Sequence, residues 1–151
     1  MNDETQEWLD YAAQDDQSAR LLLQSHLYNP CLYHIQQSIE KCLKAVIIEH
    51  ELAFQRTHSI QALVNILMQA DIAVDIDEDD IDLIDSIYMP ARYPLGSALP
   101  QFEPDQAICQ RCLQIAEHIR NWVTDFLADS VSEPEEGQSV PHENPEFPNE
   151  E

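Results

Sequence analysis

Residues 29–52 have the sequence NPCLYHIQQSIEKCLKAVIIEHEL, which contains the clearest helical pattern of the chain. Its apolar residues recur every three or four positions, which is the spacing of one face of an α-helix. The members of this apolar stripe are Leu32, Ile35, Ile39, Leu43, Val46 and Ile47. Asn29 before Pro30 is typical of an N-cap followed by the first helical residue. We therefore expect a long amphipathic helix that begins at Pro30 and ends near Leu52.

Four other segments show the same helical spacing. The first is expected over about residues 5–25, and Thr57 can cap another, whose stripe contains Ile60 and Leu67. A further helix is expected within and just after the acidic stretch 71–85, and Pro104 is expected to open the last one. The chain therefore contains five predicted helices.

Glycine and proline are distributed as in a helical protein. Only two glycines occur, Gly96 and Gly137, and neither lies inside a periodic segment, whereas β-rich folds usually need more glycine for their turns. A proline-rich loop that begins at Pro90 is expected to separate the last two helices. Amphipathic helices with mostly short connections predict an all-α fold, a four- to five-helix antiparallel up-and-down bundle.

The C-terminal segment 129–151 differs in composition from the rest. It contains four prolines and seven glutamates, and few large apolar residues. Such a segment buries too little apolar surface to offset its ordering entropy, so we expect a disordered acidic tail after a folded domain of residues 1–128.

The charge of the chain limits its partners. The net charge is −22, of which the tail supplies −8 through Asp129 and its seven glutamates, so that −14 remains on the folded part. A field of this sign repels phosphate backbones, and general binding of DNA is not expected. No apolar run approaches the length of a membrane span, and the polar N-terminus does not resemble a secretory signal. The expected location is the cytoplasm, with reduced cysteines.

No metal or cofactor site is expected. Asp75, Asp77 and Asp79 resemble the start of a calcium loop, but the glycine and the final glutamate of such a loop are absent. Cys109 and Cys112 form one C-x-x-C on a predicted helix, and no second pair completes a zinc site.

Three blocks of sequence, taken together, resemble the HEPN family. They are YHIQQSIEKCLKA at 33–45, the tetrapeptide Thr57-His58-Ser59-Ile60, and Ala91-Arg92-Tyr93-Pro94 in the loop before the last helix. The order and separation of the blocks also fit, and the resemblance spans about residues 5–127. It implies a helical bundle that forms a homodimer, with polar residues in a cleft at the interface. It also implies RNA cleavage, nucleotide binding, or partnership with a minimal nucleotidyltransferase in a toxin–antitoxin pair.

The chain departs from the ribonuclease members of that family. Those members carry an arginine and, after four to six residues, a histidine, whereas Arg92 is followed by YPLGSALPQFEP. Arg111 and His118 have this spacing, but they lie well inside the last predicted helix, and we interpret the match as chance. The departure favours binding over catalysis.

The candidate ligand site lies mainly on one stripe of the second predicted helix. His34, Gln37, Lys41 and Lys44 follow one another at helical spacing, and the two lysines are the only ones in the chain. With Arg92 and Tyr93 approaching from the loop, these residues can form a pocket for a phosphate or nucleotide. The alternative is that Glu40 and Lys44 form an ordinary i,i+4 pair and that the glutamines are surface residues.

Two other residues have two interpretations each. His58 near a helix start is either a hydrogen-bonding group or base, or a structural histidine bonded to the backbone. Arg92 offers a planar cationic fork for phosphate, or it pairs with a nearby acid.

Three functional hypotheses follow. The leading one is a HEPN homodimer that binds a nucleotide or RNA end, or a nucleotidyltransferase partner. The enzymatic alternative is a metal-independent ribonuclease, in which Arg92 stabilises the charged transition state and His34 or His58 acts as the base. The third is a structural subunit whose acidic tail mimics nucleic acid.

Overall fold

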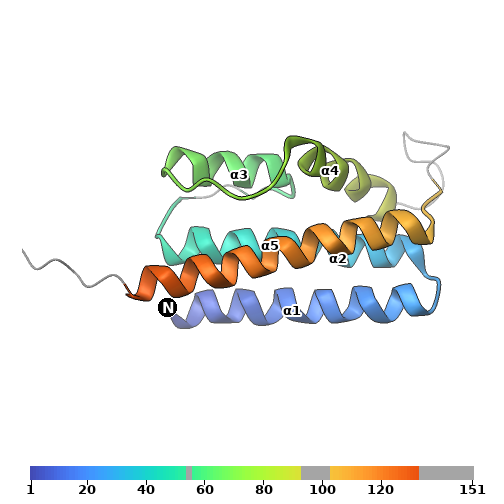
Figure 1. The fold of residues 1–151 in the computed structure, drawn as a ribbon, viewed down its shortest axis with the longest axis horizontal. Coiled ribbons are helices and arrows are strands. Elements are labelled where there is room, and N and C mark those ends of the chain that lie inside the picture. The colour runs from blue at the N-terminus through green and yellow to red at the C-terminus, as the bar shows by residue number, and fades with distance from the viewer. Residues whose placement is uncertain (54–55, 93–102, 133–151) are drawn as a thin grey trace, which may run out of the picture.

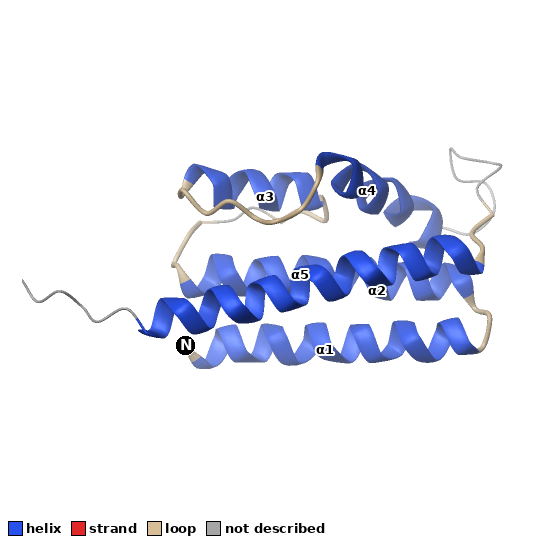
Figure 2. Ribbon diagram, viewed as in Figure 1, coloured by secondary structure: helices blue, strands red, loops and turns tan. Residues whose placement is uncertain are grey.

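In the computed structural model, residues 1–53, 56–92 and 103–132 are described, and they form five α-helices (Figure 1). Within these ranges there is no β-strand (Figure 2), and the predicted all-α class is confirmed. None of the helices in this part of the chain is both long enough and apolar enough to cross a membrane. The helices are α1 (Asp3–Gln24), α2 (Tyr28–Glu49), α3 (Ile60–Gln69), α4 (Glu78–Arg92) and α5 (Gln106–Ser132).

The three long helices α1, α2 and α5 lie side by side, and α3 and α4 follow one another along one side of them (Figure 1). A short turn joins α1 to α2, so these two helices run in opposite directions. The two short helices together occupy about the length of one long helix. Five helices therefore occupy four positions in the bundle, which agrees with the predicted four- to five-helix bundle.

Helix α2 is the centre of the bundle, because it packs against each of the other four helices. Its predicted apolar stripe is confirmed, since all six members are buried. The buried part of α2 extends to polar side chains within and beside this stripe, whereas the far side of the helix, with His34 and Lys41, is partly exposed. The buried polar residues of α2 are Gln36, Ser38, Glu40 and Lys44.

The predicted start of α2 is wrong by two residues. The helix begins at Tyr28, and the N-cap position is held by Leu27, which makes no capping bond with its side chain. Asn29 is therefore inside the helix rather than its cap. Pro30 lies in the first turn, where backbone N–H groups have no helical acceptor, so its missing N–H costs no hydrogen bond.

Two other helices begin a few residues later than expected. Ser59, not Thr57, caps α3, because the Ser59 hydroxyl accepts a bond from a first-turn amide, while the Thr57 hydroxyl accepts from the amide of Ser59. Asp105, rather than Pro104, precedes α5 directly and accepts a bond from a first-turn amide at 2.9 Å. In both cases a short polar side chain fits the cap geometry.

Helix α4 does not stop at Pro90, where the sequence predicted a loop. It continues to Arg92, which is therefore the last helical residue rather than part of a loop. Proline has a φ that suits a helix, and near a helix end it removes only one bond, that to the carbonyl of Ser86. Tyr93 and the rest of the predicted loop up to residue 102 lie outside the described residues, as does the side chain of Arg92.

Helices α1, α2 and α3 end in the same way. The second residue after each helix, His26, Glu51 or Asp71, has a positive φ of 58°, 53° or 61°. The next amide then donates to the carbonyl five residues earlier at 2.9–3.0 Å, which is the bond of a Schellman motif. The three donors are the apolar residues Leu27, Leu52 and Ile72.

Helix α5 extends to Ser132, so the first four residues of the predicted tail are helical. Residues 133–151 lie outside the described residues. The disordered tail beyond Ser132 stays a prediction.

Asp85 of α4 fixes the beginning of α3. Its carboxylate accepts bonds from the amides of Ile60 and Gln61, at 2.7 and 3.1 Å, and from the hydroxyl of Ser59 at 3.2 Å. A carboxylate at this position satisfies first-turn amides and interacts favourably with the helix dipole. Asp85 thereby also fixes the turn that carries His58.

We expect Asp85→Ala to lower the free energy of unfolding by about 1–2 kcal/mol, because it removes the acceptor at the start of α3. Urea denaturation followed by circular dichroism measures this change. Asp82→Ala is the matched control, since Asp82 is exposed on the same helix and has no bonded partner among the described residues. Equal effects of the two substitutions would contradict the capping role.

Candidate functional site

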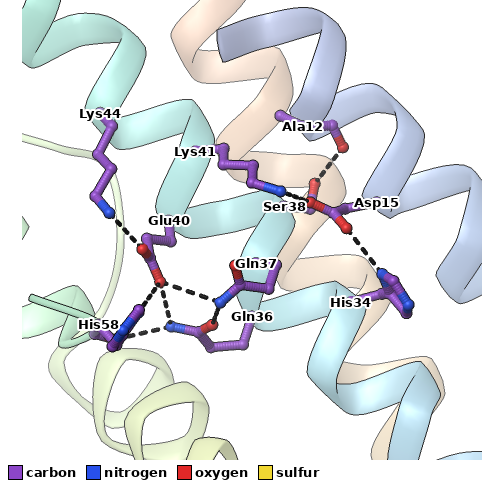
Figure 3. Close-up of polar contacts among 10 residues, drawn as sticks. All are labelled: Ala12, Asp15, His34, Gln36, Gln37, Ser38, Glu40, Lys41, Lys44 and His58. Atoms are coloured by element: carbon purple, nitrogen blue, oxygen red, sulfur yellow. Dashed lines mark hydrogen bonds and ion pairs between the residues drawn. The ribbon is translucent and has the colours of Figure 1, made fainter.

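The predicted stripe on α2 divides into two clusters, each arranged around a carboxylate (Figure 3). His34 and Lys41 contact Asp15, which comes from α1. Gln37 and Lys44 contact Glu40, which comes from α2 itself. The stripe is therefore an ordered network of side chains inside the bundle.

Asp15 joins α1 to α2. Its side chain is mostly buried, and its two oxygens bond to His34 Nδ1 at 2.8 Å and to Lys41 Nζ at 2.5 Å. Nearby, the Ser38 hydroxyl donates to the carbonyl of Ala12 at 3.0 Å. The position of two predicted site residues thus depends on a carboxylate from a different helix.

Glu40 is the more deeply buried centre, with 3% of its surface exposed. One oxygen accepts a bond from Lys44 Nζ at 2.5 Å. The other lies 3.2 Å from His58 Nδ1 and accepts from Gln36 at 3.1 Å and Gln37 at 3.3 Å. A buried carboxylate loses its hydration, and these four groups replace it.

The alternative interpretation of the stripe is right about the Glu40–Lys44 pair and wrong about surface glutamines, because Gln36 is buried. The i,i+4 pair exists, but both side chains are buried. Gln36 is fully buried as well, and its amide also donates to the carbonyl of His58 at 2.8 Å. The turn before α3 is therefore attached to α2 through both the ring and the backbone of His58.

Two aromatic rings of α1 cover the lysines. The ammonium of Lys41 lies 5.9 Å from the ring centroid of Tyr11, and that of Lys44 lies 5.5 Å from the ring centroid of Trp8. Both distances are within the range of cation–π attraction. Each lysine thus interacts with a carboxylate and with a ring.

The structure brings five predicted residues into this network: His34, Gln37, Lys41, Lys44 and His58. Nothing is described for Tyr93 or for the side chain of Arg92, so their part in the site stays a prediction.

Asp15 and the aromatic rings were not predicted from the sequence, and Glu40 was predicted only as a partner of Lys44. A signal for Asp15 was present, because it falls three residues after Ala12 and four before Ala19, and these alanines belong to the buried stripe of α1. The signal for Glu40 was its i,i+4 spacing from Lys44. The contacts of Trp8 and Tyr11 with the lysines could not be predicted, because they depend on which side of α1 faces α2.

Arg111 and His118 have acidic partners. Arg111 donates to Asp80 at 2.5 Å, and His118 Nε2 lies 2.9 Å from the carboxylate of Asp75. These contacts join α5 to the beginning of α4 and the segment before it. The interpretation of their spacing as chance stays a prediction.

The four cysteines are buried and form no disulfide. Burial raises the pKa of the Cys42 and Cys112 thiols to about 12. A thiol that stays protonated is a poor nucleophile and a poor metal ligand. In the described part of the chain, no three His, Cys, Asp or Glu side chains are placed to hold a metal ion.

The sequence model of the HEPN domain matches residues 5–126, and the chain belongs to the HEPN domain family. The chain is also similar to a protein named "Putative toxin MJ1304" from Methanocaldococcus jannaschii. The two are 28% identical over 130 residues, which cover 78% of this chain and 84% of that protein.

Three crystal structures share the fold. TT1696 from Thermus thermophilus is 22% identical, with a TM-score of 0.65, over 82% of this chain and 98% of its own. ST0689, an archaeal HEPN homologue, is 23% identical, with a TM-score of 0.61, over 82% of this chain and 97% of its own. The HEPN domain protein tm0613 from Thermotoga maritima is 24% identical, with a TM-score of 0.62, over 81% of this chain and 98% of its own.

We expect Glu40→Ala to lower the free energy of unfolding by about 3 kcal/mol or more, because it leaves Lys44 buried without its carboxylate. The double variant Glu40→Gln/Lys44→Met retains an acceptor for Gln36 and removes the buried charge, so it should recover most of this loss. Urea denaturation measures both. Asp10→Ala, which removes the exposed i,i+4 bond from Gln6, is the control and should cost under about 0.5 kcal/mol. A small effect of Glu40→Ala would contradict this account of the network.

Proposed function

We propose that this chain is a cytoplasmic HEPN binding module of a toxin–antitoxin type of system. It acts as a homodimer that binds a nucleotide or an RNA end, or pairs with a minimal nucleotidyltransferase. Membership of the HEPN family and the similarity to a protein named as a toxin candidate support this proposal.

The observation that carries the proposal is the buried polar network around Glu40 and Lys44. Replacing a buried ion pair by apolar side chains of similar volume is often neutral or stabilising, so such a pair is weak evidence for stability. Stability alone therefore gives no reason for this chain to place both of its lysines here. A need for fixed hydrogen-bond donors and acceptors at a ligand site on this side of α2 would explain why both lysines lie here.

The local charge at the network differs from that of the whole protein. Two carboxylates, Asp15 and Glu40, are balanced by Lys41 and Lys44. An anionic group that approaches the two lysines meets this local balance rather than the excess of −22 on the chain, although Glu4 and Glu7 repel it from the side of α1. The backbone of Arg92 ends the neighbouring helix α4, and its guanidinium would add positive charge if it reached the ligand.

We expect Lys41→Gln to raise the Kd for a nucleotide or a short labelled RNA about tenfold, because it removes a charged donor that is partly exposed. Calorimetry and fluorescence anisotropy measure binding, and light scattering after size exclusion measures the oligomeric state. Arg111→Gln is the matched control, since it removes an exposed cation that pairs with Asp80. A purified monomer that binds no nucleotide, no RNA and no nucleotidyltransferase would refute the proposal.

One observation favours the ribonuclease alternative. His34 and His58 each place Nδ1 against a carboxylate, Asp15 and Glu40 respectively. A carboxylate in this position selects a ring tautomer and orients the imidazole, as it does for the general base of a catalytic triad. Among the described residues, none bonds to Nε2 of His34.

RNA cleavage separates the two functions. Parent protein and Arg92→Ala would be incubated with labelled single-stranded and hairpin RNA in the presence of a chelator. The binding proposal expects no cleavage by either protein. Cleavage by the parent that falls at least about a hundredfold in Arg92→Ala would establish the enzyme instead, because loss of one transition-state donor typically costs that much.

A further inference from the structure

A pocket of about 480 Å³ lies beside the network, on the side of α1. Small-molecule sites typically have volumes of about 300–1,000 Å³. The residues that line this pocket are Glu4, Glu7, Trp8, Tyr11 and Lys41. The four from α1 follow the spacing i, i+3, i+4 and i+7, so they share one stripe of that helix.

The pocket presents aromatic surface. Tyr11 is 49% exposed although it is a large ring, and Trp8 is half-buried beside it. The lysines lie over these rings without enclosing Tyr11. Exposed rings beside a pocket provide a stacking surface for a planar ligand, and such stacking does not depend on charge.

The polar groups of the lining disfavour a charged group inside the pocket, so that the phosphate of a bound nucleotide lies outside it. Glu4 and Glu7 are acceptors and repel phosphate, and among the described residues neither carboxylate has a bonded partner. Lys41 is a donor and repels a guanidinium or ammonium group. A group that suits both the glutamates and the lysine is neutral and carries hydrogen-bond donors as well as acceptors. Stacking on the rings requires it to be planar. A nucleobase with an exocyclic amino group meets all of these requirements.

We propose that this pocket binds an amino-bearing nucleobase, the base of the nucleotide or RNA end that the proposed function requires. The base stacks on Tyr11 and Trp8. Its exocyclic amine donates to Glu4 or Glu7, and Lys41 donates to a ring nitrogen or carbonyl oxygen of the base. The inference rests on the proposed nucleotide binding and names the residues that select the base.

Trp8 provides a direct signal for binding. The chain has two tryptophans, and Trp122→Phe leaves Trp8 as the only one. In this variant we expect AMP to change the fluorescence of Trp8 with saturation, and UMP, which lacks the amino group, to bind about tenfold more weakly. Ribose 5-phosphate, which has no base, should cause no change. Triadenylate that binds more tightly than AMP would identify an RNA end as the source of the base.

Substitutions then test the stacking and the amine contact. Tyr11→Ala should raise the Kd for AMP about tenfold, since a stacked ring typically contributes this much per base, whereas Tyr11→Phe should leave it within about twofold. Glu4→Gln/Glu7→Gln should reduce the preference for AMP over UMP. Asp82→Asn, an exposed acid on α4, is the matched control and should change nothing. Calorimetry on the chain with both tryptophans gives an independent measurement.

Three outcomes would overturn the inference. They are binding of ribose 5-phosphate as tight as that of AMP, an unchanged Kd in Tyr11→Ala, and no binding of any base by the parent protein. An unchanged Kd in Tyr11→Ala together with weakened binding in Lys41→Gln would leave the proposed function in place. A parent protein that binds no base but co-purifies with a nucleotidyltransferase would overturn this inference and leave the proposed partnership with a nucleotidyltransferase in place.

Discussion

Most of α2 is buried, and this burial governs how the other helices pack around it. Its interior side carries Glu40 and Lys44, which solvent barely reaches. Every group around them must therefore find a partner within the protein. This requirement brings His58 against α2, and Asp85 fixes the turn that carries it. Among the described residues, no buried side-chain nitrogen or oxygen lacks a hydrogen-bond partner.

The helices could be predicted because their apolar spacing reflects which face is buried, and spacing is a property of the sequence alone. The stripe of α2, from Leu32 to Ile47, is buried as expected. The helix ends were less predictable. Thr57 and Ser59 are both good capping residues, and the choice between them depends on Asp85, which is distant in sequence. Pro90 was treated as a break, but the cost of a proline depends on how much of the helix follows it.

The site was predictable only in part. His34, Gln37, Lys41 and Lys44 come close together because one helix carries them all. The acid that holds His34 and Lys41 comes from α1, and no local spacing within α2 indicates a contact across helices. The same reasoning applies to Trp8 and Tyr11, whose position against the lysines depends on the rotation of α1 relative to α2. The family resemblance identified the fold, whereas the pairing of charges required the three-dimensional structure.

The three Schellman turns have a consequence for the unfolded chain. Each places a residue other than glycine, His26, Glu51 or Asp71, in the left-handed region, where a Cβ atom is strained by roughly 1 kcal/mol. In return, the unfolded chain lacks the extra backbone freedom that a glycine would give it at these positions, so it loses less entropy on folding. The protein thus combines slightly strained helix ends with a less disordered denatured state. This combination favours helices that stop at fixed residues, which keeps the two ends of α2 in register with their neighbours.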